Sequence, residues 1–142
     1  MMSVWSFEHC VEANVAPDTA WRFWTDVSNW TFDPSLEWVT LEPAFITGAK
    51  GVTKPRGADP VEWCIRDVAD RHATIEMTFP GAVVRFHWSF LPTCHGCTRI
   101  TQQVTLSGPQ AGDFVGLAES HLARGIPQGM RRLAEVLEGH RS

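Results

Sequence analysis

Over most of the chain hydrophobic and polar residues alternate with a period of two, which is typical of half-buried β-strands. The first alternating segment covers residues 4–14 and places His9 on its more apolar face. Six later segments predict further strands at residues 36–42, 51–56, 61–68, 72–79, 82–91 and 97–106. Because short turns such as Pro80-Gly81 separate the last strands, the pattern indicates an antiparallel meander.

Two regions show helical spacing instead. Behind Pro17, apolar residues between positions 20 and 27 recur every three or four residues, which predicts two short helices after the first strand. From about residue 111 a broad apolar stripe predicts one long C-terminal helix. A proline in a helix interior removes a hydrogen bond and crowds the preceding turn, so we expect Pro127 to bend or split this helix near Gly125.

The order of these elements predicts an α+β fold in one domain spanning residues 1–142. The apolar face of a seven-stranded sheet needs cover, and the C-terminal helix is the one element long enough to supply it. Strands twist, so the sheet should curve and hold this helix across its concave face. We expect the two short helices after the first strand to close one end and a hollow to remain between sheet and helix.

Composition narrows the possible functions. Hydrophobic residues make up 44% and charged residues 20%, as in globular domains, and 7 Trp and 8 Phe accompany no Tyr, which excludes a catalytic tyrosine. The net charge of −4 argues against nucleic-acid binding and against docking on anionic membranes. With no apolar run of membrane-spanning length and no secretory signal in the sequence, we expect no membrane insertion, a cytoplasmic location and free cysteine thiols.

Several motifs together resemble the START-like superfamily, also described as the polyketide cyclase/dehydrase and lipid-transport (SRPBCC) group. They are Pro-Asp-Thr-Ala-Trp at 17–21, Trp-Thr-Phe-Asp-Pro at 30–34, Gly-Cys-Thr-Arg-Ile-Thr at 96–101 and Gly-Pro at 108–109, followed by the closing helix. Ala20 stands where the family usually has valine, Phe32 where it has a second tryptophan, and Cys97 is an insertion or substitution. The resemblance implies the helix-grip fold and a hydrophobic cavity. It selects no reaction, because members include lipid carriers, hormone receptors, polyketide cyclases and activators of a chaperone ATPase.

Strand alternation and the helical stripe indicate which side chains face that cavity. The residues expected to bind a ligand are Trp24, Trp63, Ile65, Met77, Phe79, Phe86, Trp88, Gln102, Phe114, Leu117, Ala118 and Gly125. Three inward polar residues, His9, Gln102 and His121, are expected to converge. The two histidines are the candidate catalytic residues, since an imidazole can transfer protons near neutral pH. The alternative is that each imidazole is satisfied by a backbone carbonyl or lies in water at the rim.

The leading hypothesis is a binding protein for a small hydrophobic or aromatic molecule, lipid-like or polyketide-like, acting as a monomer or homodimer without a cofactor. The alternative is a cyclase or dehydratase in which a cavity histidine moves a proton. A third reading, an interaction protein, would need an exposed groove that the pattern does not show. Cys94 and Cys97 form a C-x-x-C in a strand-to-strand turn, where a hairpin is favoured over a zinc or redox site, so no metal is expected.

Overall fold

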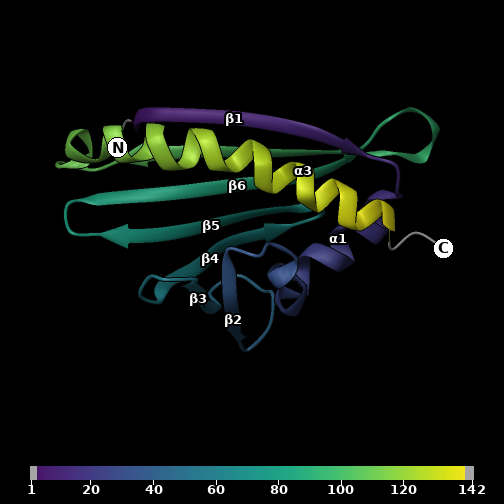
Figure 1. Cartoon of the computed structure of the whole chain (residues 1–142), viewed down its shortest axis with the longest axis horizontal. Coiled ribbons are helices and arrows are strands. Elements are labelled where there is room, and N and C mark those ends of the chain that lie inside the picture. The colour runs from purple at the N-terminus through teal and green to yellow at the C-terminus, as the bar shows by residue number, and fades with distance from the viewer. Residues whose placement is uncertain (1–2, 140–142) are drawn as a thin grey trace.

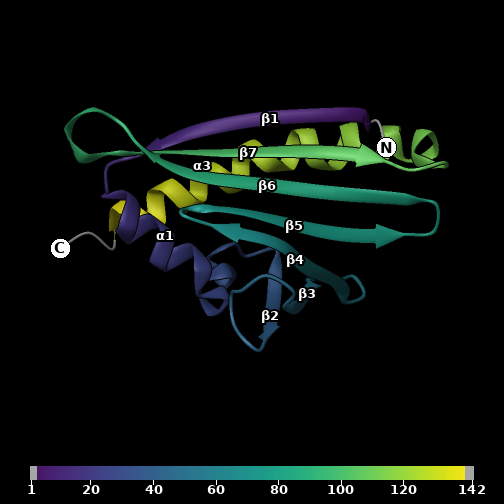
Figure 2. The same cartoon turned by 180° about the vertical axis from the view of Figure 1, so that it is seen from behind.

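The computed structural model describes residues 3–139 and contains one antiparallel sheet of seven strands. The strands are β1 (Ser3–Ala13), β2 (Leu36–Glu42), β3 (Lys50–Pro55), β4 (Val61–Ala69), β5 (His72–Phe79), β6 (Ala82–Pro92) and β7 (Thr98–Ser107). Their spatial order is β1-β7-β6-β5-β4-β3-β2, so consecutive strands pair except where β1 joins β7 (Figures 1 and 2). The predicted meander is confirmed, and each strand boundary lies within one residue of the prediction.

The helices lie before and after the meander, except the short η2 in the connection between β6 and β7. They are α1 (Pro17–Thr25), η1 (Val27–Phe32), η2 (Cys94–Gly96), η3 (Ala111–Phe114), α2 (Val115–Leu117), η4 (Ala118–Leu122) and α3 (Ala123–Gly139). In Figure 1 α3 runs in front of the sheet from the end near the N-terminus toward α1, as the helix-grip fold requires. Pro17 starts α1, where its missing N–H costs no hydrogen bond, and the Asp26 carboxylate starts η1 by accepting from the Ser28 N–H at 3.1 Å.

The C-terminal helix is anchored to the sheet by a fully apolar contact face. Met130, Leu133 and Leu137 are at most 1% exposed and share a core with Phe90 and Ile100 of the sheet. Burying each leucine contributes roughly 1.5–3 kcal/mol. This end of α3 is therefore fixed, while the cavity described below lies along the same helix toward its N-terminus.

The predicted split of the helix near Gly125 does not occur. The α3 helix continues through Pro127, and the irregular turn is η4, one turn earlier, where the Ala123 N–H donates to the Ala118 carbonyl five residues back. Proline has no N–H for the Ala123 carbonyl four residues before it, and its ring crowds that carbonyl. A widened π-type turn just upstream accommodates this defect without ending the helix.

Strand β2 also departs from simple alternation. Its register against β3 shifts between Leu36 and Trp38, so these two side chains no longer share a face. Trp38 is 42% exposed, whereas Val39 and Leu41 pack against the core. A bulge of one residue exchanges inside and outside along a strand, and the sequence gives no signal of where it falls.

Candidate ligand-binding cavity

A cavity of about 380 Å³ lies between the concave face of the sheet and the N-terminal half of α3. Its volume is within the range of natural small-molecule sites, and its wall is mostly aromatic and aliphatic. The lining residues are Trp24, Trp30, Phe32, Asp33, Ser35, Leu36, Thr53, Trp63, Ile75, Met77, Phe86, Trp88, Gln102, His121, Leu122, Gly125, Ile126, Gly129, Met130 and Leu133. Within the described residues α3 comes nearest to β1 among the strands, which leaves the space on the side of β3 to β7.

Four tryptophans form a continuous row along one wall. The ring centroids of Trp63 and Trp30 are 5.3 Å apart, those of Trp30 and Trp24 are 5.7 Å apart, and those of Trp24 and Trp88 are 4.9 Å apart. Hydrogen bonds hold two of the indoles: Trp30 Nε1 donates to the Trp24 carbonyl oxygen at 2.6 Å, and Trp63 Nε1 donates to Thr53 Oγ1 at 2.8 Å. The wall is therefore preorganised to stack against flat apolar groups.

A glycine in the neighbouring strand makes room for one of these rings. Gly51 on β3 stands opposite Trp63 on β4, and a Cβ on Gly51 would overlap the Trp63 indole. The indole can lie over the strand because position 51 has no side chain.

Two glycines leave the surface of α3 without side chains where it faces the cavity. Gly125 and Gly129 are four residues apart, so they lie on one side of the helix, and both line the cavity. A Cβ on Gly125 would meet no atom within 4 Å, and one on Gly129 would lie 3.8 Å from Asp33 Oδ2. Each interior glycine costs a helix about 1 kcal/mol relative to alanine, so this sequence gives up helix stability and retains open volume.

Gln102 is the buried polar residue of the cavity wall. It lies on β7, is 6% exposed, and its side chain takes part in none of the hydrogen bonds among the described residues. Every fully buried side-chain nitrogen or oxygen of residues 3–139 has a partner, so the polar atoms of Gln102 reach the open space of the cavity. The carboxamide can therefore donate and accept hydrogen bonds toward a molecule in the cavity.

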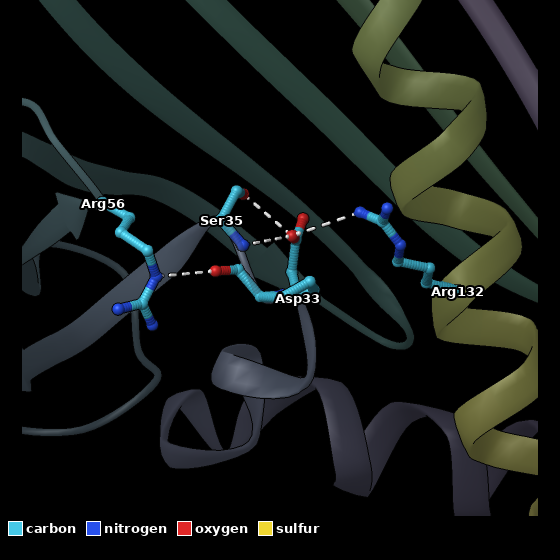
Figure 3. Close-up of polar contacts among 5 residues, drawn as sticks. Asp33, Ser35, Arg56 and Arg132 are labelled. Atoms are coloured by element: carbon cyan, nitrogen blue, oxygen red, sulfur yellow. Dashed lines mark hydrogen bonds and ion pairs between the residues drawn. The ribbon is translucent and has the colours of Figure 1, made fainter.

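A carboxylate lies where η1 leads into β2, beside α3. Asp33 Oδ1 accepts hydrogen bonds from Ser35 N at 2.9 Å, Ser35 Oγ at 2.8 Å and Arg132 Nη1 at 3.4 Å (Figure 3). Arg56 Nε donates to the Pro34 carbonyl at 3.0 Å and holds the same loop from the other side. Among the described lining residues Asp33 is the one carboxylate, and no lysine or arginine lines the cavity.

The histidines do not converge as expected. His121 lines the cavity but is exposed, with Nδ1 3.0 Å from Ser120 Oγ and 3.2 Å from the Leu117 carbonyl oxygen. His9 stands directly opposite Gln102 in the sheet but does not line the cavity, because it belongs to the edge strand on which α3 packs. The structure therefore brings Gln102 and His121 to one space and leaves His9 outside it.

Of the twelve residues expected to bind a ligand, seven line the cavity: Trp24, Trp63, Met77, Phe86, Trp88, Gln102 and Gly125. The other five do not. Ile65 is 1% exposed within the main core, and Ala118 is 6% exposed in a second core cluster that Phe114 also joins. Phe79 is 37% exposed and stacks on Phe114 with a centroid distance of 6.2 Å, and Leu117 is 57% exposed.

These misplacements have identifiable causes. Phe79 has the predicted place in the alternation of β5. It is the last residue of that strand, however, and lies beyond the end of the cavity. Leu117 precedes the widened turn at 118–122, and one extra residue in a helical turn rotates the preceding side chains by about 100°. The apolar stripe that describes α3 therefore does not predict which side chains face the cavity before that turn.

Sequence reasoning missed other lining residues. The polar ones are Asp33, Ser35 and Thr53, and a further lining residue is Gly129. Asp33 belongs to the Trp-Thr-Phe-Asp-Pro segment used for the family resemblance, and the spacing of Gly125 and Gly129 in a helix was a readable signal. Nothing in the sequence pointed to Thr53, because its orientation depends on the pairing of β3 with β4.

Other ionisable and thiol groups lie away from the cavity. The Lys54 ammonium lies 2.7 Å from the exposed Glu37 carboxylate, and this hydrogen bond lowers the pKa of Glu37 below its ordinary value. Cys10, Cys64 and Cys97 are free thiols, and Cys97 Sγ lies 3.5 Å from Asn14 Oδ1. The prediction for Cys94 concerns a side chain outside the described residues. Among the described side chains, which do not include that of Cys94, no cluster of His, Cys, Asp and Glu could hold a metal ion, and no described helix is long and apolar enough to cross a membrane.

Known structures share this architecture. Norcoclaurine synthase from Thalictrum flavum, solved with dopamine and hydroxybenzaldehyde, is 14% identical, with a TM-score of 0.74 over 97% of this chain and 88% of that one. The Zhui aromatase/cyclase from Streptomyces sp. R1128 is 15% identical, with a TM-score of 0.76 over 94% and 93% of the two chains. A protein from Thermobifida fusca is 20% identical, with a TM-score of 0.72 over 93% and 92%. At these identities the likeness establishes the fold alone.

The sequence comparison gives the family directly. No curated protein matches the chain. The family described as polyketide cyclase / dehydrase and lipid transport matches residues 4–138, which is nearly the whole chain. With the helix-grip fold in place, this protein belongs to the polyketide cyclase/dehydrase and lipid-transport family.

Proposed function

We propose that this protein binds one small hydrophobic, aromatic molecule in the cavity between the sheet and α3. The observation that carries the proposal is the carboxamide of Gln102, which faces the cavity from an apolar wall and has no hydrogen-bond partner among the described residues. A single polar group in an otherwise apolar pocket wall can hydrogen-bond to a bound molecule and fix its orientation. The ligand would therefore carry a carbonyl, hydroxyl or similar group.

The tryptophan row supports an aromatic ligand in particular. Stacked or edge-on aromatic pairs contribute about 0.5–1.5 kcal/mol beyond the burial of their area. Trp24 and Trp88 are already fixed by neighbouring rings, so little side-chain freedom is lost when a ligand ring packs beside them. A flat ring system of the polyketide type suits this wall better than a single flexible acyl chain.

A second candidate is a cyclase or dehydratase acting on such a molecule. The observation that favours it is His121, an exposed imidazole on the cavity lining whose Nδ1 is within hydrogen-bond distance of Ser120 Oγ and the Leu117 carbonyl. That contact would leave Nε2 to exchange a proton with a bound substrate, and a positioned general base contributes roughly 10²–10⁴-fold to a rate. The family includes cyclases by its description, and the aromatase/cyclase fold matches this chain.

Native mass spectrometry of the purified protein, compared with the same sample after denaturation, tests the binding function. We expect an added mass that disappears on denaturation and identifies the ligand class, or, in an empty preparation, uptake of an added aromatic probe such as 2-naphthol. Failure to retain any aromatic molecule, together with tryptophan fluorescence unaffected by such probes, would contradict the proposal. The cytoplasmic location and the monomeric or homodimeric state stay predictions.

A further inference from the structure

We infer that Asp33 sets the ligand preference of the cavity: it favours ligands that carry a hydrogen-bond donor and disfavours carboxylates. The inference rests on the proposed binding function and adds a selection rule to it. It concerns a residue that neither the strand pattern nor the helical stripe identified. The geometry of its two carboxylate oxygens is the basis of the argument.

One carboxylate oxygen of Asp33, Oδ1, makes the contacts that hold the surrounding loop in place. All three hydrogen bonds that the Asp33 side chain accepts end on Oδ1: two from Ser35 and one from Arg132 (Figure 3). These contacts fix the turn into β2 and tie it to α3. None of the hydrogen bonds among the described residues ends on Oδ2, so the second oxygen keeps its acceptor capacity.

The free oxygen has space beside it. Oδ2 lies 3.8 Å from where a Cβ would stand on Gly129, and both Asp33 and Gly129 line the cavity. A larger residue at 129 would crowd this oxygen. The Asp33 side chain is 22% exposed, so a group bound there is only partly solvated and its interactions are screened less than on an open surface.

The charges around the cavity favour ligands with a hydrogen-bond donor over ligands with a carboxylate. Asp33 is the one carboxylate among the described lining residues, none of those residues is lysine or arginine, and Arg132 is engaged on Oδ1. A carboxylate ligand beside Oδ2 would thus meet a like charge, and no lysine or arginine lines the cavity to compensate it. A hydroxyl or an ammonium group would instead donate to Oδ2, forming a charge-assisted hydrogen bond.

A matched probe series tests this inference on the full-length protein at pH 7. The probes are 2-naphthol, 2-naphthylmethylammonium, 2-naphthoate and 2-methylnaphthalene, titrated by tryptophan fluorescence and checked by calorimetry. We expect the two donor-bearing probes to bind at least about tenfold more tightly than naphthoate. The affinity of methylnaphthalene should lie between that of the donor-bearing probes and that of naphthoate. The two donor probes also tell whether a hydroxyl or an ammonium group is preferred.

Two variants separate ligand selection from a structural role. Asp33→Asn keeps an oxygen for Ser35 but removes the charge, and it should weaken the two donor probes and relieve the penalty on naphthoate by about tenfold. Arg132→Gln disturbs the same network from the other side while leaving Oδ2 in place, so it should preserve the order of the probes. If both variants change affinity for all probes equally, Asp33 is only a structural anchor and the inference is overturned.

The outcomes distinguish this inference from the proposed function. Binding of all four probes with equal affinity would overturn the selection rule and leave the binding function standing. Tighter binding of naphthoate than of naphthol would overturn it as well. If no probe binds, methylnaphthalene included, the proposed function itself fails and the selection rule fails with it.

Discussion

Gln102 on β7 and Trp88 on β6 stand directly opposite each other in the sheet, and both line the cavity. Directly opposed residues of an antiparallel pair point to one face with their Cβ atoms about 4.5–5.5 Å apart. A ring that stacks beside the Trp88 indole would therefore hold its polar substituent within reach of the Gln102 carboxamide. This pairing gives the cavity a flat apolar surface and a hydrogen-bonding group at adjacent positions, which is the basis of the binding proposal.

Replacing Gln102 should separate stability from binding. In Gln102→Leu a carboxamide that faces the cavity becomes an apolar side chain of similar size, so the unfolding free energy of the ligand-free protein, measured in urea, should change by less than about 1 kcal/mol. Affinity for 2-naphthol should fall about tenfold. The matched control is Thr98→Val on the same strand, because the fully buried Thr98 Oγ1 does have a partner, the Val15 carbonyl at 2.7 Å. That variant should lose about 1 kcal/mol, and an equal or larger loss of stability in Gln102→Leu would contradict our description of the site.

Filling the space beside α3 should block the cavity. A side chain at position 125 meets no atom within 4 Å at its Cβ, so Gly125→Leu should fold normally and gain up to about 1 kcal/mol of helix stability. Its leucine would occupy ligand space, and probe affinity should fall by more than about tenfold. Gly116→Leu is the control, because position 116 is also helical with open space around it but lies outside the cavity. Unchanged probe uptake in Gly125→Leu would show that Gly125 does not bound the binding space.

The two histidines should behave differently. His121 lines the cavity and His9 does not, although both were predicted to act on the ligand. If the protein is a cyclase or dehydratase, His121→Ala should lower turnover by roughly 10²-fold or more, with the fold intact by circular dichroism. His9→Ala should leave turnover within about twofold of the wild type. Equal losses in both variants would indicate that β1 contributes to the site in a way the cavity geometry does not include.

Position 51 should be intolerant of any side chain. In Gly51→Ala the new Cβ overlaps the Trp63 indole, so the ring must leave its place over β3 or the strand must shift. Overpacking of this kind typically costs about 1–3 kcal/mol, measurable by thermal or urea unfolding. The Trp63 hydrogen bond to Thr53 should be lost with it, changing the tryptophan fluorescence. Gly116→Ala provides the comparison, since it adds the same methyl group in open space, and equal stability of the two variants would refute the close contact.

Local patterns were sufficient for the elements of this fold. Alternation located the strands because each has one buried and one wetter face, and turn residues such as Pro80-Gly81 marked their connections. The same alternation correctly oriented Trp63, Met77, Phe86, Trp88 and Gln102 toward the cavity. It also identified Gln102 as an inward polar residue, because a glutamine on an apolar face is recognisable without coordinates.

Tertiary structure decided the composition of the site, because three of its determinants leave no local trace. The bulge in β2 turned Trp38 outward, and the widened turn before α3 rotated Leu117 to the surface. Because α3 packs against β1, His9 lies outside the cavity and space remains beside Asp33 and Gly129. The sequence by itself determined the order of the elements and their buried faces, since these depend on neighbours within a few residues. The position of the cavity and the free oxygen of Asp33 depend on segments about a hundred residues apart, which only packing brings together.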